Sequence, residues 1–234
     1  MHSIISNKIC LKEKMRANQK RFLFFLSDLC LLFILFGCAS PAYRFHPEFE
    51  MRARNIEIPA LILSDVRIYK SSPGGVVELR DDWCAIAKRN LLNALLRAFK
   101  DKHYSIKPLT TDEEIAEEME EIQALYRAVN RSIRLHTYGP QLFPEKESNF
   151  DYSLGPIEGI LRKSKADSMV FVYGFGEVAT GERKALVSVA VADSSGTIVW
   201  YCVKGSLGGY DLRDPESVTA LVEDIFSSFP EAGG

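Results

Sequence analysis

Three β-rich runs separated by two tight turns constrain the fold of this 234-residue chain more than any other feature. Residues 169–173 are continuously apolar, which is typical of a strand buried on both faces. Residues 185–192 and 198–203 form the other two runs, and the turns fall at 179–182 and 193–197. Turns this short join neighbouring strands, so the pattern predicts an antiparallel meander.

Before the meander, strand and helix patterns alternate along the chain. We expect strands at 58–69 and 104–109, helices at 83–102, from Thr111 onward and at 156–165, and a last helix that opens at Asp214. The predicted order is β-α-β-α-α-β-β-β-α. This order predicts an α/β (α+β) fold in which one mixed sheet carries helices packed on it and ends in the meander and a C-terminal helix.

The helix after Thr111 begins with a capping box formed by Thr111 and Glu114. Apolar residues then recur at steps of four and three, at Ile115, Met119, Ile122, Tyr126, Val129 and Ile133. The pattern is typical of an amphipathic helix packed on its own domain. The alternative is a seam for a partner helix, although a coiled coil needs more heptads than this.

The first 37 residues have the parts of a secretory signal. Lys20 and Arg21 precede an apolar run at 22–36, and a small residue, Gly37, follows it. Residues 1–14 are polar and long for a signal, which makes Met15 a candidate for the true start. An uncleaved transmembrane helix is the alternative, but it needs about 20 apolar residues and would have to tolerate Asp28.

The segment Leu35-Phe36-Gly37-Cys38 resembles the lipobox of bacterial lipoproteins. The resemblance implies cleavage between Gly37 and Cys38, transfer of diacylglycerol to the Cys38 thiol, and acylation of the new amino terminus. Two or three acyl chains hold a protein durably on a membrane. By the same resemblance, Ala39 favours sorting to the outer membrane, with the protein facing the periplasm. Phe36 and Asp28 depart from the usual pattern.

These features divide the chain into four parts. We expect a signal peptide at 1–37, a lipidated tether at 38–56, a mixed α/β periplasmic domain at 57–230 and a tail at 231–234. The signal holds six of the 29 basic residues and two of the 31 acidic ones, so the remaining chain has a net charge of about −6. An acidic body argues against binding to nucleic acid through phosphate contacts.

Two cysteines remain in the predicted domain, Cys84 and Cys202. Disulfides persist in the compartment that an export signal implies, so one bond between them is the simplest arrangement. Two isolated buried thiols are the alternative.

The sequence shows no catalytic, cofactor or metal motif. Gly174-Phe175-Gly176 lacks the third glycine of a nucleotide-binding loop. Arg183 and Lys184, beside a hairpin turn, are candidate contacts for an anionic partner, although a solvated turn explains them equally well. Tyr201 is a further candidate contact if its side of the sheet is uncovered.

The domain resembles the amino-terminal domain of TolB and the lipoprotein LpoB in general features. These are Ala166-Asp167-Ser168 before a buried strand, and Asp193-Ser194-Ser195-Gly196-Thr197 leading into Ile198-Val199-Trp200. No functional residue transfers with this likeness. By analogy, we expect a non-enzymatic envelope lipoprotein that binds a periplasmic or outer-membrane protein, of undetermined oligomeric state.

Two alternatives belong to other classes of function. A hydrolase or small-ligand site could assemble from distant residues, with His103, His136 and Asp151 as candidates. An accessory subunit of an export assembly, as in CsgG-like lipoproteins, would need long alternating segments that the sequence lacks.

Overall fold

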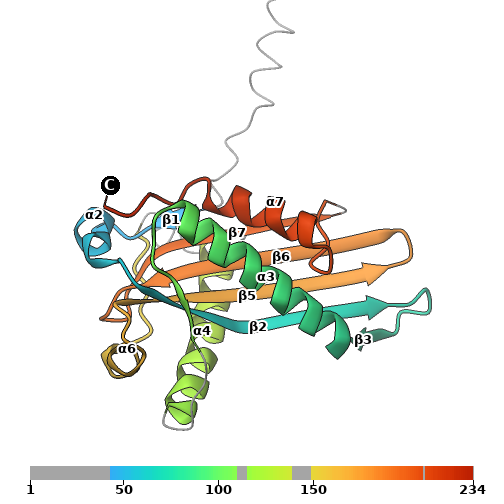
Figure 1. The fold of residues 1–234 in the computed structure, drawn as a ribbon. Coiled ribbons are helices and arrows are strands. Elements are labelled where there is room, and N and C mark those ends of the chain that lie inside the picture. The colour runs from blue at the N-terminus through green and yellow to red at the C-terminus, as the bar shows by residue number, and fades with distance from the viewer. Residues whose placement is uncertain (1–42, 110–114, 139–148, 208, 234) are drawn as a thin grey trace, which may run out of the picture. The chain divides into compact units, whose positions relative to one another are not determined.

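The computed structural model describes residues 43–109, 115–138, 149–207 and 209–233. They form a seven-stranded mixed sheet with helices on both faces (Figure 1). The strands are β1 (Tyr43–Phe45), β2 (Pro59–Ser71), β3 (Val77–Leu79), β4 (Lys107–Pro108), β5 (Ser168–Ala179), β6 (Glu182–Ala192) and β7 (Ile198–Leu207). Their order across the sheet is β1-β7-β6-β5-β2-β3, and β4 pairs with β2. The predicted fold class is confirmed.

The meander is formed by β5, β6 and β7, which pair antiparallel along most of their length. β5 also pairs parallel with β2, so it occupies the middle of the sheet. The turn before β7 requires glycine at Gly196, because its φ is +79° and a Cβ there would overlap the carbonyl oxygen of Gly155. The turn sequences therefore set the strand order at this end of the sheet.

Two layers of helix cover the sheet. α3 (Asp81–Asp101) and α7 (Pro215–Phe226) lie on one face, and α4 (Ala116–Thr137) and α6 (Glu158–Ser164) lie on the other (Figure 1). α2 (Phe49–Arg52) and a 3-10 turn (Ala53–Asn55) lead into β2. Side chains of a strand alternate between faces, so Trp200 is buried under α7 and Tyr201 is buried on the α4 side.

The core under α3 and α7 is largely aromatic. Phe99 packs edge-on against Phe226 at 4.8 Å, and Trp200 lies 4.7 Å from Phe229 between ring centroids. α7 begins as the sequence predicts, because the Asp214 carboxylate accepts a hydrogen bond from the Ser217 amide.

α4 is attached to the opposite face by its apolar seam and by one buried polar group. Tyr126 stacks on Phe171 of β5, with centroids 4.8 Å apart. The Asn130 side-chain oxygen accepts hydrogen bonds from the Ser188 hydroxyl at 2.9 Å and the Tyr201 hydroxyl at 2.7 Å. The seam of α4 is thus buried within its own domain, so the interpretation as a seam for a partner helix is wrong.

The predicted tether at 38–56 is wrong over most of its length. β1 pairs with β7, Tyr43 opposite Cys202, and Phe45 and Phe49 pack against the aromatic core. These elements are too short to show a hydrophobic period, and prolines interrupt the segment, which hides them in the sequence. The signal at 1–37, residues 38–42 and the capping residues Thr111 and Glu114 lie outside the described residues.

Two further strands differ from expectation. The predicted strand at 104–109 is reduced to β4, because Tyr104 turns into the aromatic core instead of pairing with the sheet. The sequence prediction misses β3, a three-residue strand with every residue exposed. In the predicted tail, the Ala232 amide donates a hydrogen bond to the Lys102 carbonyl.

Replacing Asn130 tests how α4 is held. Asn130→Ala leaves the Ser188 and Tyr201 hydroxyls buried without their acceptor, so we expect a loss of about 2–4 kcal/mol in the free energy of unfolding. Urea denaturation should show a lower midpoint at unchanged m value. Asn93→Ala, on the exposed side of α3, is the matched control and should change the midpoint little. Equal effects of the two substitutions would contradict this account.

Candidate functional site

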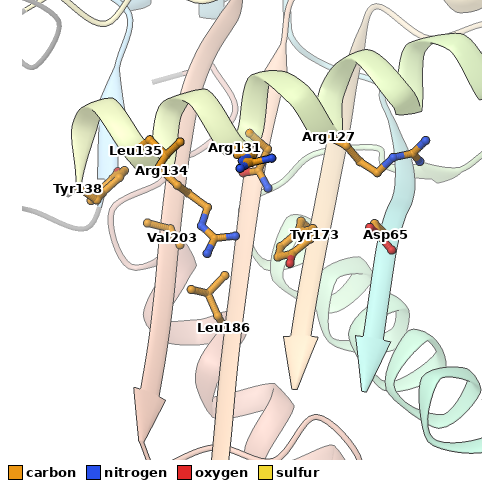
Figure 2. A pocket seen from close by; sticks show the side chains of 10 residues that line it. Asp65, Arg127, Arg131, Arg134, Leu135, Tyr138, Tyr173, Leu186 and Val203 are labelled. Atoms are coloured by element: carbon orange, nitrogen blue, oxygen red, sulfur yellow. The ribbon is translucent and has the colours of Figure 1, made fainter. Parts of the chain in front are cut away.

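A groove lies beside α4 on the face of the sheet that this helix only partly covers. Its cavity measures about 590 Å³. Figure 2 shows α4 crossing the strands of the sheet, with Tyr173 of β5, Leu186 of β6 and Val203 of β7 along the floor. Arg127, Arg131 and Arg134 of α4, together with these three floor residues and Asp65 of β2, define what we call the arginine groove.

The three arginines share one side of α4 because they are spaced by four and three residues. Each directly follows a buried position, Tyr126, Asn130 or Ile133, so they lie on the flank of the helix next to the sheet. The Arg134 guanidinium is half-buried and sits 5.4 Å from the centre of the Tyr173 ring. Such a cation–π contact holds the side chain over the floor (Figure 2).

None of these three guanidinium groups forms a salt bridge with any residue that the structure describes. The one carboxylate of the groove, Asp65, is already paired with Arg67 at 2.8 Å. The groove therefore carries an excess of positive charge in a domain whose overall charge is negative. Unneutralised cations at a recessed surface suit an anionic ligand.

At the β7 end of the groove, Tyr138 follows α4 and meets β1. The Arg44 guanidinium lies 5.1 Å from the centre of the Tyr138 ring. Burial raises the pKa of Tyr138, so its hydroxyl stays neutral at physiological pH. The groove therefore ends at β1, the first strand of the described domain.

The three arginines give the groove permanent positive charge. Guanidinium groups stay protonated and only donate hydrogen bonds. Beneath them, burial raises the pKa values of Tyr126 and Tyr201, which keeps both phenols neutral. Among the described residues, no group of three or more potential metal ligands comes together.

The prediction that Tyr201 contacts a partner is wrong. Its side chain is fully buried, and its hydroxyl donates to Asn130, because α4 covers this part of the sheet. Arg183 and Lys184 lie at the β5–β6 hairpin with loose ion pairs, both 3.7 Å long, to Asp211 and Glu177. A partner contact through this pair stays a prediction.

Cys84 and Cys202 are free thiols in the structure, buried in the core under α3 and α7. The Ile68 amide donates a hydrogen bond to the Cys84 sulfur at 3.2 Å. Burial raises the pKa of the Cys202 thiol to about 12. The structure therefore agrees with isolated buried thiols and not with a disulfide between them.

The candidate hydrolytic residues do not assemble. His103 follows α3 and His136 lies on α4, on opposite faces of the sheet. Asp151 faces His46, with its carboxylate 3.6 Å from Nε2. The chain elements that carry these three residues are therefore too separate to form one catalytic site.

The predicted turn motifs have structural roles. Asp167 accepts hydrogen bonds from the amides of Glu57 and Ile58, which fixes the backbone immediately before β2 begins. Asp193 accepts from the Ser195 and Thr197 amides and pairs with Arg52 at 2.8 Å. Asp167 and Asp193 therefore stabilise the ends of strands. The likeness to TolB and LpoB noted in the sequence rests on such structural residues, so it assigns no functional residue.

The sequence analysis missed the three arginines of the groove. Their spacing of four and three was visible and parallels the apolar seam. The pattern alone does not show that the sheet beside this flank of the helix is uncovered, and only that fact distinguishes a binding surface from a solvated one.

The comparisons with known proteins show distant structural similarity only. No protein-family model and no curated protein matches the sequence. The fold is similar to a PelC dodecamer subunit from Paraburkholderia phytofirmans, with a TM-score of 0.36, 15% identity, and 77% of this chain and 91% of that chain covered. It is also similar to the LpoB C-terminal domain from Salmonella enterica, with a TM-score of 0.25, 10% identity, and coverage of 64% and 82%.

The predicted likeness to LpoB is thus supported as a distant structural similarity. The lipobox and the likeness to TolB stay predictions. Within the part of the chain that the structure describes, no helix has the length and apolar character to cross a membrane.

The buried thiols give a test of the core. In the native protein at pH 8, Cys84 and Cys202 should resist a thiol reagent such as iodoacetamide, because both are buried and the Cys202 pKa of about 12 leaves almost no thiolate. Both should react once urea unfolds the protein. Mass spectrometry of the two cysteine-containing peptides measures the labelling, and rapid native labelling of Cys202 would contradict the structure.

Proposed function

We propose that this protein is a non-enzymatic lipoprotein of the bacterial outer membrane. Acyl chains on Cys38 hold it on the membrane, and its domain faces the periplasm and binds another envelope protein through the arginine groove. The observation that carries the proposal is the groove itself, where three arginines without salt bridges among the described residues border an uncovered sheet surface.

The placement of these arginines has a cost for the fold. Like charges four residues apart on a helix destabilise it by about 0.2–0.5 kcal/mol per pair. Arg127 and Arg131 form such a pair, and Arg134 follows one turn later. A neighbouring carboxylate would relieve the repulsion, yet Asp65 is taken up by Arg67. A bound ligand that supplies negative charge would offset the repulsion between these arginines.

The floor of the groove supports a protein partner. Tyr173, Leu186 and Val203 are half-buried and offer apolar surface beside the cations. Interface centres combine apolar contacts with arginine in this way. Leu135, with 57% of its surface exposed, adds an apolar residue to the helix side.

The signal and lipobox support the membrane anchor. β1 begins at Tyr43, five residues after Cys38, and an extended chain of that length spans at most about 18 Å. With Cys38 acylated, the domain would lie close to the membrane surface, without the long tether that the sequence suggested.

Cys38→Ser tests the anchor. The wild-type protein should fractionate with membranes, and the variant should lose processing and acylation. Thiol counting in urea gives a second measurement: a processed and acylated chain shows two free thiols, Cys84 and Cys202, whereas the uncut chain shows five, or four if it starts at Met15. Normal processing of the variant, or four or five thiols in the purified wild-type protein, would rule out the lipid anchor.

Site-specific photo-crosslinking in intact cells tests the groove. A benzoylphenylalanine at Leu135 should capture one envelope protein of defined mass, because this residue borders the groove. The matched control is Val77 of β3, which is equally exposed at 57% and does not line the groove. Indistinguishable products from the two positions would contradict partner binding at this surface.

A further inference from the structure

We infer that the arginine groove receives an extended acidic segment of a partner protein, with carboxylates at alternate residues. This inference rests on the proposed function and adds the chemistry of the partner. It follows from the spacing of the arginines, the contact of Arg134 with the face of the Tyr173 ring, and the half-buried position of Arg134.

The arginines form a row and do not converge on one point. A helix rises 1.5 Å per residue, so the Cα atoms of Arg127 and Arg134 are separated by about 10 Å along α4. Figure 2 shows the three guanidinium groups spread along α4 instead of gathered around one point, so a ligand with several negative groups matches them better than a single phosphate or carboxylate does. In an extended chain, side chains on one side repeat about every 7 Å. Successive arginines are separated by about 6 and 4.5 Å along α4, and their flexible side chains can take up the difference, so acidic residues at alternate positions can meet successive arginines.

The floor of the groove argues against an acidic polysaccharide as the ligand. Sugar rings bind proteins by stacking on open aromatic faces, but the Arg134 guanidinium already lies over the Tyr173 ring. Leu186 and Val203 offer aliphatic contact, which suits the side chains of a peptide. Carboxylates of such a peptide can pair with guanidinium groups through two parallel hydrogen bonds.

The position of the cations argues against binding to a lipid surface. Arg134 points from the flank of α4 towards the sheet, between Tyr173 and Val203 (Figure 2). Arg127 and Arg131 are exposed, but a flat bilayer cannot reach Arg134 between the helix and the sheet, whereas a single extended chain can contact all three. The observations therefore favour a peptide segment over anionic headgroups.

The test measures binding of a defined probe to the purified full-length protein in detergent. The probe is a fluorescent 12-residue peptide of alternating glutamate and leucine, followed by fluorescence anisotropy. We expect the triple variant Arg127→Gln, Arg131→Gln, Arg134→Gln to bind it about tenfold more weakly or worse. Binding to the wild-type protein should weaken with added salt, and the corresponding lysine–leucine peptide should not bind.

A matched variant controls for net charge. Arg89→Gln, Arg97→Gln and Lys100→Gln remove the same charge from exposed positions of α3, on the other face of the sheet. This variant should bind the acidic peptide within about twofold of the wild-type protein. Arg131→Gln alone, at an exposed position, gives an intermediate loss and keeps the test independent of the folding of the triple variant.

Each result decides the inference. Equal binding by the groove variant and the wild-type protein, or equal losses in the two triple variants, would overturn it. So would arginine-dependent binding of polygalacturonate or phosphatidylglycerol vesicles without binding of the acidic peptide. If the crosslinker at Leu135 still captures one envelope protein while the peptide does not bind, the inference of an acidic segment is wrong and the proposal of partner binding stands. If Leu135 captures nothing distinct from Val77, partner binding itself is wrong.

Discussion

The attachment of α4 to the sheet through Asn130 determines the rest of this face of the molecule. Its side-chain oxygen accepts from two buried hydroxyls, of Ser188 on β6 and Tyr201 on β7. A buried acceptor with two partners fixes the rotation of the helix about its own axis more strictly than apolar packing does. With Asn130 directed at the sheet, the residue after each buried position must lie on the flank. The arginine row is therefore a consequence of the polar contact beneath it.

The two faces of the sheet are covered unequally, and the difference produces the groove. α3 and α7 bury an aromatic core along one face (Figure 1). On the other face, α4 crosses the strands instead of running along them, so it covers only part of their length. The strands therefore continue past the helix with a mixed surface, in which Tyr173 and Leu186 stand near Asp65 and Arg67. A sheet face that is only partly covered offers surface for binding, while the residues under α4 still form a buried hydrophobic core.

The sequence predicts those elements whose signals are local and periodic. The meander, β2, α3 and α7 follow from apolar runs, glycine turns and a capping aspartate. β1 and α2 escape prediction because their stability comes from pairing with β7 and from packing of Phe45 and Phe49, which are long-range contacts. The error over Tyr201 has the same origin. Alternation along β7 shows that Trp200 and Tyr201 point to opposite faces, but coverage of a face depends on a helix some seventy residues earlier.

The proposed anchor at Cys38 and the arginine groove are connected through β1. Arg44 of this strand meets Tyr138 at one end of the groove, and Arg44 is only six positions after Cys38 in the chain. An extended chain of that length spans at most about 22 Å. If Cys38 is acylated, one end of the groove lies within that reach of the lipid attachment. A partner segment in the groove would then be held at a restricted height above the membrane, which favours membrane-associated partners because tethering raises their effective concentration.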